Sequence, residues 1–324
     1  MAQALPSIGS PFFYTVFFIA VLLMIAVDML ALKKTGAHKV SAREAAGWSL
    51  VWVSVASAFG GWLWWVLAHD PAHGVAVANQ KTLEFFTGYV IEKSLAVDNI
   101  FVFLMIFGFF KVPVEHQRRV LLYGVFGAIV LRTLMVFLGA ALVQQFGWIL
   151  YVFGAFLLFT GLKMLLPEKE EQQDLTDNAL LKFLRRHIRM TDKLHGEAFF
   201  VLQNGLRHAT PLFLVLVMVE LSDVVFAVDS IPAIFAVTVD PFIVLTSNIF
   251  AILGLRAMFF LLAGVADRFH LLRYGLAIVL AFIGMKLLLL PLLHVPVALS
   301  LGVVFVVIAG AVIASLLFPR PRQP

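Results

Sequence analysis

The segment EKSLAVDNI occupies positions 92–100, and the segment ELSDVVFAVDSI occupies positions 220–231. Both place acidic residues inside long apolar stretches of the chain. A charged side chain at the centre of a membrane span costs roughly 2.5 to 3.5 kcal/mol on insertion scales. Acids in such stretches therefore point to function, and the shared AVD pattern indicates that the two segments are copies of one unit.

The sequence around these segments repeats as well. VFGAIVLRTLMVFLGA at 125–140 matches IFAILGLRAMFFLLAG at 249–264, and GLKMLLP at 161–167 matches GMKLLLL at 284–290. The matches are collinear, and they align Arg132 with Arg256. Each unit holds three expected spans, and an odd number forces the second copy to enter the membrane upside down. Inverted repeats of this kind are typical of secondary transporters, whose substrate site lies at the repeat interface.

The composition is that of a membrane protein. Of 324 residues, 62% are hydrophobic and 13% are charged, about half the charged share of a soluble domain, and the mean hydropathy is +0.99. The chain has no cysteine, which excludes disulfides, thiolate metal sites and thiol redox chemistry. The 32 phenylalanines are expected to face lipid.

The apolar stretches predict an all-α, polytopic transmembrane helical bundle. Each stretch is near the roughly 20 residues that a helix needs to cross a bilayer. The nine expected spans are 12–32, 48–68, 84–110, 119–143, 147–166, 208–236, 241–264, 272–291 and 297–318.

Orientation follows from the basic residues of the short loops, because cytoplasmic loops are enriched in Lys and Arg. With the N-terminus outside, only Lys81 falls in an outer loop. Lys163 and Lys286 lie near span ends, from where their ammonium groups are expected to reach the headgroups. The loop charges therefore predict an outer N-terminus and a cytoplasmic C-terminus. In this orientation the cytoplasmic loops and the C-terminal tail hold eleven basic residues: Lys33, Lys34, Lys39, Arg43, Lys111, Arg118, Arg119, Arg268, Arg273, Arg320 and Arg322.

The spans divide the chain into five regions. Residues 1–83 hold two N-terminal spans, 84–166 the first repeat, 208–291 the second repeat, and 292–324 the last span and a tail. Residues 167–207 form a cytoplasmic linker, in which 178–190 is either an amphipathic helix at the membrane surface or one amphipathic turn of a solvated linker. The net charge of +5 calls for no nucleic-acid partner, because the basic residues lie in short loops.

The two acidic segments supply only oxygen ligands. Under the repeat alignment Glu92 matches Asp223. Asp98 matches Asp229 in the same way, so four carboxylates are expected to converge. Hard oxygen ligands suit Mg²⁺, Ca²⁺ and Mn²⁺, whereas Zn²⁺ and Cu²⁺ are expected to recruit imidazole or sulfur, and no histidine lies deep in a predicted span. The sequence predicts a metal site, for Mn²⁺ above all, made by Glu92, Asp98, Asn99, Glu220, Asp223, Asp229 and Ser230.

Helix geometry limits how this site can form. Positions six apart on an ideal helix differ by about 240° in direction and about 9 Å in height. Glu92 and Asp98 therefore cannot reach one ion from an unbroken helix. Either the helices unwind there, or one acid of each pair lines the access path. Pro232 favours a break in the second copy, and the first copy has no such proline.

Two deep arginines offer a purely structural alternative. The buried acids could pair with Arg132 and Arg256 simply to hold helices together. The acids outnumber these arginines, however, and a cation would neutralise the remaining charge. We therefore expect the arginines to compensate the acids when no cation is bound. For Asp28 a ligand role and a packing role both stay open, and Asn248 is a further candidate oxygen donor.

These residues also carry a family resemblance, which extends from the first span to the last. The chain resembles the TerC family of tellurium-resistance membrane proteins through EKSLAVDNIFVF, VELSDVVFAVDSIPAIFAVT, DPFIVLTSNIFAILGLRAMFFLLAGV and YGVFGAIVLRTLMVF, and its Alx branch through AAGWSLVWV. The resemblance implies a manganese exporter of the bacterial inner membrane. The acidic motifs of the family correspond here to Glu92, Asp98, Asn99, Glu220, Asp223, Asp229 and Ser230. Tellurite itself is not the expected cargo, because an oxyanion would need positive ligands.

The expected function is export of Mn²⁺ from the cytoplasm by a secondary transporter in the lipid bilayer, with protons as the counter-ion. Two alternatives stay open: a membrane sensor or scaffold that binds metal without moving it, and an exporter of another hard dication such as Ca²⁺. We expect no permanently bound cofactor and no enzymatic activity. The GxGD and GxSxG patterns of intramembrane proteases are missing, and so are the paired intramembrane histidines that would hold a haem.

Overall fold

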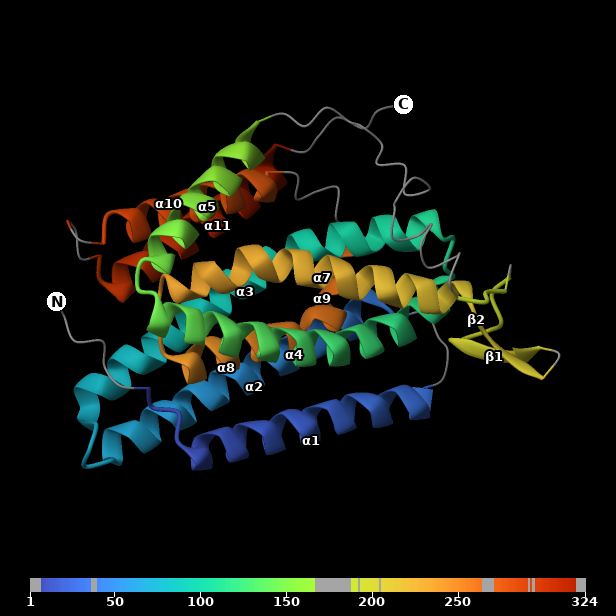
Figure 1. The fold of residues 1–324 in the computed structure, drawn as a ribbon, viewed down its shortest axis with the longest axis horizontal. Coiled ribbons are helices and arrows are strands. Elements are labelled where there is room, and N and C mark those ends of the chain that lie inside the picture. Colours follow the sequence, from blue (N-terminus) through green and yellow to red (C-terminus); the bar gives the residue numbers. More distant parts are fainter. Residues whose placement is uncertain are drawn as a thin grey trace.

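The fold was analysed in a computed structural model, which describes residues 7–35, 40–166, 188–191, 193–203, 205–263, 271–290, 292 and 295–318. It is an all-α bundle with one small hairpin (Figure 1), so the predicted fold class is confirmed. The elements are α1 (Pro11–Thr35), α2 (Ala42–His69), α3 (Gly74–Phe109), α4 (Val114–Gln145), α5 (Ile149–Leu165), β1 (Phe200–Gln203), β2 (Leu206–Ala209), α7 (Pro211–Phe235), α8 (Pro241–Leu253), α9 (Leu255–Ala263), α10 (Leu272–Leu288) and α11 (Val297–Leu317).

Every predicted span coincides with a helix or, at 241–264, with the pair α8 and α9. Within the described ranges, five helices are long and apolar enough to cross a membrane, or six if α8 and α9 form one bent span. Helix α3 is not among them, and its 36 residues include five charged ones, Lys81, Glu84, Glu92, Lys93 and Asp98. The chain is thus a multi-pass membrane protein, and the count of nine spans stays a prediction.

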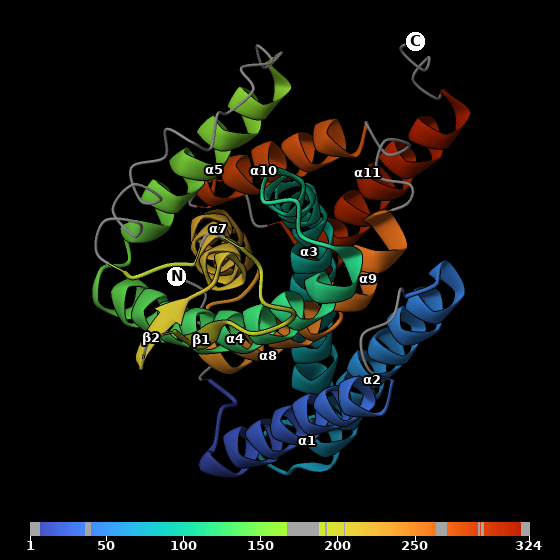
Figure 2. The same cartoon turned by 90° about the vertical axis from the view of Figure 1, so that its right-hand side faces the viewer.

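The helices lie roughly along one axis, with α1 and α2 on one side and α5, α10 and α11 on the other (Figures 1 and 2). Helix α8 lies between these outer groups, and each of its residues from Phe242 to Leu253 is buried. Helices α1 and α11 instead expose large apolar side chains, among them Leu22, Val306 and Leu317. Such surfaces are stable against lipid rather than water, which agrees with a membrane-embedded bundle.

Aromatic side chains fill much of the interior. Phe59 of α2 packs against Phe250 of α8 with ring centroids 4.7 Å apart. Phe17 and Phe85 each contact both of these rings, and Phe242 packs against Phe17. These side chains are buried. The expectation that the phenylalanines face lipid is therefore wrong for this group. Their burial joins α1, α2 and α3 to the central helix α8.

Helices α5 and α10 approach each other closely through glycines. A Cβ added to Gly284 of α10 would lie 2.5 Å from the backbone nitrogen of Leu158, and one added to Gly161 of α5 would lie 2.7 Å from the carbonyl oxygen of Ala277. No side chain fits at either distance. Small residues at helix interfaces allow this approach in membranes, and here they occupy the aligned positions of the two sequence repeats.

The packing pairs the helices of the two sequence repeats crosswise. Helix α3 packs on α8, α4 packs on α7, and α5 packs on α10. A two-fold relation between residues 84–166 and 208–291 would exchange these same pairs. The pattern agrees with inverted repeats, and the repeat relation itself stays a prediction.

The expected break at Pro232 is absent. Helix α7 is continuous from Pro211 to Phe235, and α3 is continuous through Glu92 and the backbone of residue 98. Pro232 lies in the last turn of α7, where little of the helix depends on its missing N–H. The break lies instead at Gly254, where α8 and α9 meet at 42°.

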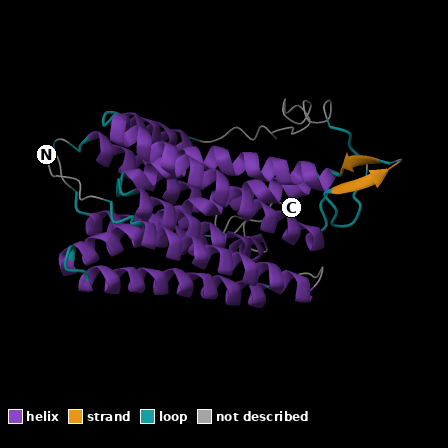
Figure 3. Ribbon diagram, turned by 60° about the horizontal axis from the view of Figure 1, so that its bottom comes forward, coloured by secondary structure: helices purple, strands orange, loops and turns teal. Residues whose placement is uncertain are grey.

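A two-stranded antiparallel hairpin precedes α7, and the hydropathy pattern did not predict it. Strands β1 and β2 pair Phe200 with Ala209 and Gln203 with Leu206. Figure 3 shows the hairpin projecting from one end of the bundle, and α1 begins at the opposite end (Figure 1). We call these the hairpin end and the N-terminal end; the latter also carries residues 70–73 and 236–240. Most of the segment 178–190, for which an amphipathic helix was considered, lies outside the described residues.

Candidate cation site

Arg132 of α4 is the centre of a buried ionic cluster. Its Nε and Nη2 donate to the two carboxylate oxygens of Asp223 on α7, at 2.9 and 2.7 Å. Its Nη1 donates to Glu92 of α3. All three side chains are at most 3% exposed. The bidentate contact fixes the guanidinium plane, so Arg132 bridges the two helices that carry the acidic segments.

Amide and hydroxyl groups complete the cluster. The Arg132 guanidinium also donates to Asn248 Oδ1 of α8 at 2.8 Å and to Ser230 Oγ of α7 at 3.3 Å. Asn99 of α3 donates to Asp223 Oδ1 at 3.4 Å. Four helices therefore supply the polar atoms of this buried cluster. Glu92, Asp223, Asn248 and Ser230 present oxygen to the arginine, whereas Asn99 presents its amide nitrogen to Asp223.

The cluster keeps unused hydrogen-bonding capacity. Glu92 Oε2 and Asn248 Nδ2 are buried and have no partner in the described structure. A buried carboxylate oxygen without a partner is costly. If both acids are ionised, one guanidinium faces two negative charges. The site therefore favours a further positive group near Glu92.

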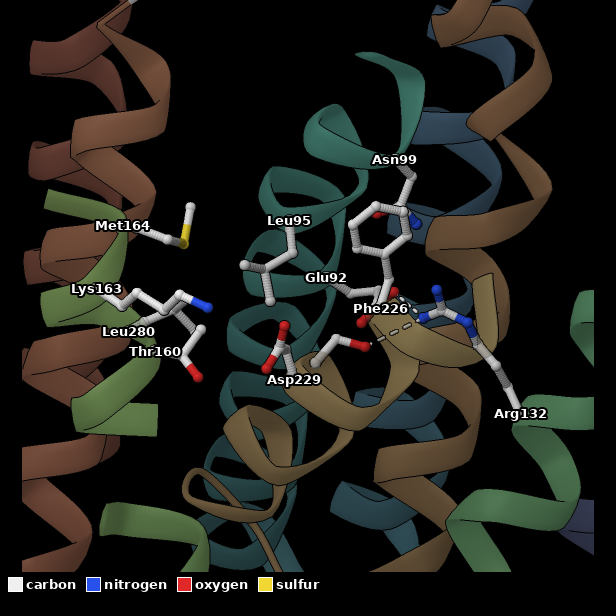
Figure 4. A pocket seen from close by; sticks show the side chains of 11 residues that line it. Glu92, Leu95, Asn99, Arg132, Thr160, Lys163, Met164, Phe226, Asp229 and Leu280 are labelled. Carbon is white, nitrogen blue, oxygen red and sulfur yellow. Dashed lines mark hydrogen bonds and ion pairs between the residues drawn. The ribbon is translucent and has the colours of Figure 1, made fainter. Parts of the chain in front are cut away.

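A cavity of about 230 Å³ adjoins the cluster (Figure 4). Glu92, Asn99, Arg132 and Ser230 contribute to one part of its lining. Thr160 and Lys163 of α5 extend towards Asp229 of α7 from across the space, and the Thr160 hydroxyl interacts with the Asp229 carboxylate. This volume holds several waters, since one water needs about 10–15 Å³ by the same kind of measure, or a partly hydrated ion.

Three of the predicted ligands are not placed in this cavity. Asp223 belongs to the cluster but lines a separate, smaller crevice. Glu220 lies three residues before Asp223 on α7, and its carboxylate packs against Gly127 of α4. Its Oε2 is buried without a partner, and Glu220 does not line the cavity. The side chain of Asp98 lies outside the described residues. Convergence of the four aligned carboxylates therefore stays a prediction.

The described residues contain no group of three or more His, Cys, Asp or Glu side chains arranged to hold a metal ion. Arg132 lies between Glu92 and Asp223 and bonds to both. In this arrangement the guanidinium is the positive group that both carboxylates contact.

Asp28 and Arg256 form a separate buried pair. Arg256 of α9 donates to Asp28 of α1, and both side chains are 7% exposed. Neither residue lines the larger cavity. A small crevice between α3, α4, α7 and α9 has both Asp223 and Arg256 in its lining. The two arginines thus neutralise different acids on either side of this crevice.

Sequence reasoning missed several polar residues. Thr160 belongs to the cavity although it was not a candidate, and Lys163 faces the cavity rather than extending only to the headgroups. Lys81, assigned to a loop, is buried in α3 with Glu84 and contacts Asp240. The spacing of three residues between the opposite charges of Lys81 and Glu84 was the only feature of the sequence that indicated this network. Asp240, the third member, is far away in the sequence.

The fold and the cluster define a multi-pass helical membrane protein with a buried, mainly acidic site beside an internal cavity. The Integral membrane protein TerC family model matches residues 77–323. The chain belongs to the TerC family.

Its curated relatives extend over almost the whole chain. It is 59% identical over 299 residues to a protein of Escherichia coli K12 named "Putative membrane-bound redox modulator Alx", with 92% of each chain covered. A protein of the same name from Photorhabdus laumondii is 54% identical, covering 95% of this chain and 96% of its own. An uncharacterized membrane protein of Myxococcus xanthus is 45% identical, covering 98% and 96%. No solved structure matches the chain.

Proposed function

We propose that this protein is an inner-membrane transporter that exports Mn²⁺ from the cytoplasm. One observation carries the proposal: a buried pair of carboxylates, Glu92 and Asp223, is held by a guanidinium that reaches in from a neighbouring helix. An acidic site without Arg132 would attract a cation strongly. With Arg132 in place, the site can be empty of metal and still be stable.

The chemistry of the cavity favours a hard or borderline dication. Glu92, Asp229, Ser230 and Asn99 offer carboxylate, hydroxyl and amide oxygens to the cavity. The chain has no thiolate, and among the residues that the structure describes no histidine lines this space. Mn²⁺, Mg²⁺ and Ca²⁺ prefer oxygen ligands of this kind, and Mn²⁺ also tolerates a mixed, partly hydrated shell.

Binding and release are proposed to proceed by exchange of positive charge. A dication entering the cavity would displace the Arg132 guanidinium from Glu92 and take over the oxygens that it held. Returning the guanidinium would expel the ion. Asp223 keeps a bidentate contact with Arg132, so the arginine has an anchor to which it can retreat.

Transport further needs access from each side in turn. We propose that the unit 84–166 rocks against the unit 208–291 around the cluster, as in inverted-repeat transporters. Protons are the proposed counter-ion, because carboxylates such as Asp229 can carry either a proton or part of the metal charge. Mn²⁺ uptake into inverted vesicles should then respond to an imposed pH gradient, and indifference to the gradient would refute antiport.

The decisive measurement is radioactive Mn²⁺ flux into proteoliposomes that contain the purified protein. Asp229→Asn should abolish saturable flux while leaving the folded protein intact, because Asp229 lines the cavity without contacting Arg132. Glu115→Gln is the matched control, since Glu115 is an exposed acid in the first turn of α4. Normal flux through Asp229→Asn would remove this residue from the site.

The flux assay also separates the alternatives. Metal binding without flux would favour a sensor or scaffold. Flux of Ca²⁺ in preference to Mn²⁺ would identify Ca²⁺ as the transported ion. The relatives' name refers to redox modulation, but this sequence has no cysteine with which to perform thiol redox chemistry.

A further inference from the structure

A second buried ionic network lies at the N-terminal end of the bundle. Lys81 Nζ of α3 is 3.1 Å from Glu84 Oε2 and 3.1 Å from Asp240 Oδ2. The three side chains are at most 5% exposed. Removing three charged groups from water is costly and is tolerated only when each is closely paired. Partial separation would leave buried charges unpaired, so the three side chains are expected to be either fully paired or fully separated.

The network joins three segments that are distant in sequence. Thr238, in the connection between α7 and α8, donates to Glu84 Oε2 at 2.6 Å. Ser7 Oγ and the Ile8 N–H, which precede α1, donate to the two oxygens of Asp240 at 2.7 and 3.0 Å. One cluster therefore ties the start of α3, the α7–α8 connection and the N-terminal segment together at this end (Figure 1).

The same contacts cross the boundary between the two proposed moving units. Glu84 begins the unit 84–166, whereas Thr238 and Asp240 belong to the unit 208–291. From Glu84 to Glu92, α3 rises about 12 Å at 1.5 Å per residue. Rocking of one unit against the other at this end has to separate the 81–84 turn from the 238–240 connection.

The charges of the network suit a contact that opens and closes. Glu84 and Asp240 face the ammonium of Lys81, and Lys286 of α10 lies close enough to Glu84 to interact electrostatically. Closed, the positive and negative groups neutralise one another. Open, two carboxylates are hydrated at the mouth of the path, where negative charge attracts a cation released from the cavity.

We propose that Lys81, Glu84 and Asp240 form a gate that closes the N-terminal end of the cation path; this inference rests on the proposed function. The Lys81 ammonium is a tethered cation that joins the two carboxylates while the gate is shut. Separation of Lys81 from Asp240 opens the cavity to the outer side. Closure restores the buried pairs and excludes water.

The test uses the natural absence of cysteine. The variant Leu280→Cys places a single reporter thiol in the cavity, because Leu280 is an apolar residue of the cavity lining. A membrane-impermeant cationic methanethiosulfonate reagent is then applied to each side of oriented membrane vesicles. A separate Ala72→Cys variant, in the turn at the N-terminal end, identifies the side on which that end lies.

Opening the gate should accelerate modification of the reporter from that side. Asp240→Asn and Glu84→Gln, each combined with Leu280→Cys, are expected to raise the labelling rate about tenfold, which corresponds to about 1.4 kcal/mol in the opening equilibrium. Asp70→Asn is the matched control. Asp70 lies at the same end, its side chain is 35% exposed, and the Ala72 N–H holds the pKa of its carboxyl below the usual range, so this change also removes one negative charge.

Folding is checked separately by monodispersity in detergent. If Asp240→Asn does not fold, Thr238→Val is the deciding variant. It removes the two hydrogen bonds of the Thr238 hydroxyl, which donates to Glu84 and accepts from the Asp240 N–H, and it leaves the three charges of the network in place. Unchanged labelling in every folded gate variant would overturn the proposal, as would an equal rise in Asp70→Asn. Labelling of the reporter does not depend on metal flux, so it can detect the gate even in a protein that does not transport Mn²⁺. Failure of the gate proposal is therefore distinguishable from failure of the proposed transport function.

Cross-linking tests whether the gate must open during transport. Lys81→Cys/Asp240→Cys is joined by a short bifunctional methanethiosulfonate, and Mn²⁺ flux is measured before and after reduction. Flux should fall to background in the linked protein and return on reduction. Full flux through a completely linked protein would show that this contact does not open.

Discussion

Arg132 and Asp223 lie 91 positions apart in the sequence and form a bidentate ion pair inside the bundle, with contacts of 2.9 and 2.7 Å. The pair joins α4 to α7, and the same guanidinium also bonds to Glu92 of α3. A planar guanidinium can hold two carboxylates and two amide or hydroxyl groups at once, which a lysine ammonium does not reproduce. The position therefore requires arginine rather than any positive charge.

Removing the guanidinium should destabilise the protein in the absence of metal. Arg132→Gln leaves Glu92 and Asp223 buried together without a cation, and breaking a buried pair costs about 3 to 5 kcal/mol. The Tm in detergent is expected to fall clearly, and Mn²⁺ should recover more Tm in the variant than in the wild type. The measurement is thermal unfolding with and without added metal.

Arg119→Gln serves as its control on the same helix, since Arg119 is 36% exposed and pairs with Glu197 at 3.5 Å. Exposed pairs contribute about 0 to 1 kcal/mol, so its Tm should hardly change. A similar Tm for Arg132→Gln and the wild type would contradict the account of the cluster.

Neutralising Asp229 and neutralising Glu220 should affect Mn²⁺ binding differently, because the two side chains lie in different places. Asp229 lines the cavity, whereas Glu220 packs on Gly127 outside it. We expect Asp229→Asn to weaken Mn²⁺ binding at least about tenfold, a loss of about 1.4 kcal/mol, and Glu220→Gln to change it much less. Isothermal titration with the purified proteins gives both values. A larger loss in Glu220→Gln would return Glu220 to the ligand set.

The close approach of α5 and α10 should not tolerate a methyl group. In Gly284→Ala the new Cβ would lie 2.5 Å from the backbone nitrogen of Leu158, so the helices must separate at a cost of about 1 to 3 kcal/mol. Unfolding in a denaturant series measures this cost. Gly302→Ala is the control, because Gly302 lies in α11 with open space around it; equal stability of the two variants would show that the contact is loose.

The helical break and the helical proline should respond differently to substitution. Gly254→Ala would bring a Cβ to 2.4 Å from Lys93 Nζ and 3.2 Å from Trp52 Cβ, at the junction where α8 and α9 bend by 42°. We expect it to reduce Mn²⁺ flux severalfold, whereas Pro232→Ala leaves flux near that of the wild type because α7 is already continuous. The reverse order of effects would make Pro232 the functional hinge.

The sequence by itself determined the class of fold and the chemical character of the site. Apolar stretches of span length require helices, because a backbone in lipid must satisfy its hydrogen bonds within each segment. Acids inside those stretches are too costly to be incidental. The positions of Glu92, Asp223, Ser230 and Asn248 around Arg132 follow that expectation.

Only the tertiary structure decided which charges meet. Periodicity shows on which face of a helix a residue lies, but not which helix covers that face. The sequence pattern therefore assigned Lys81 to a loop, whereas in the structure it lies in α3 and pairs with Asp240. For the same reason Glu220 shares a motif with Asp223 yet lies outside the cavity, and Thr160 belongs to it without any motif. Ion pairs between helices depend on long-range packing, in which residues from distant segments share one desolvated space.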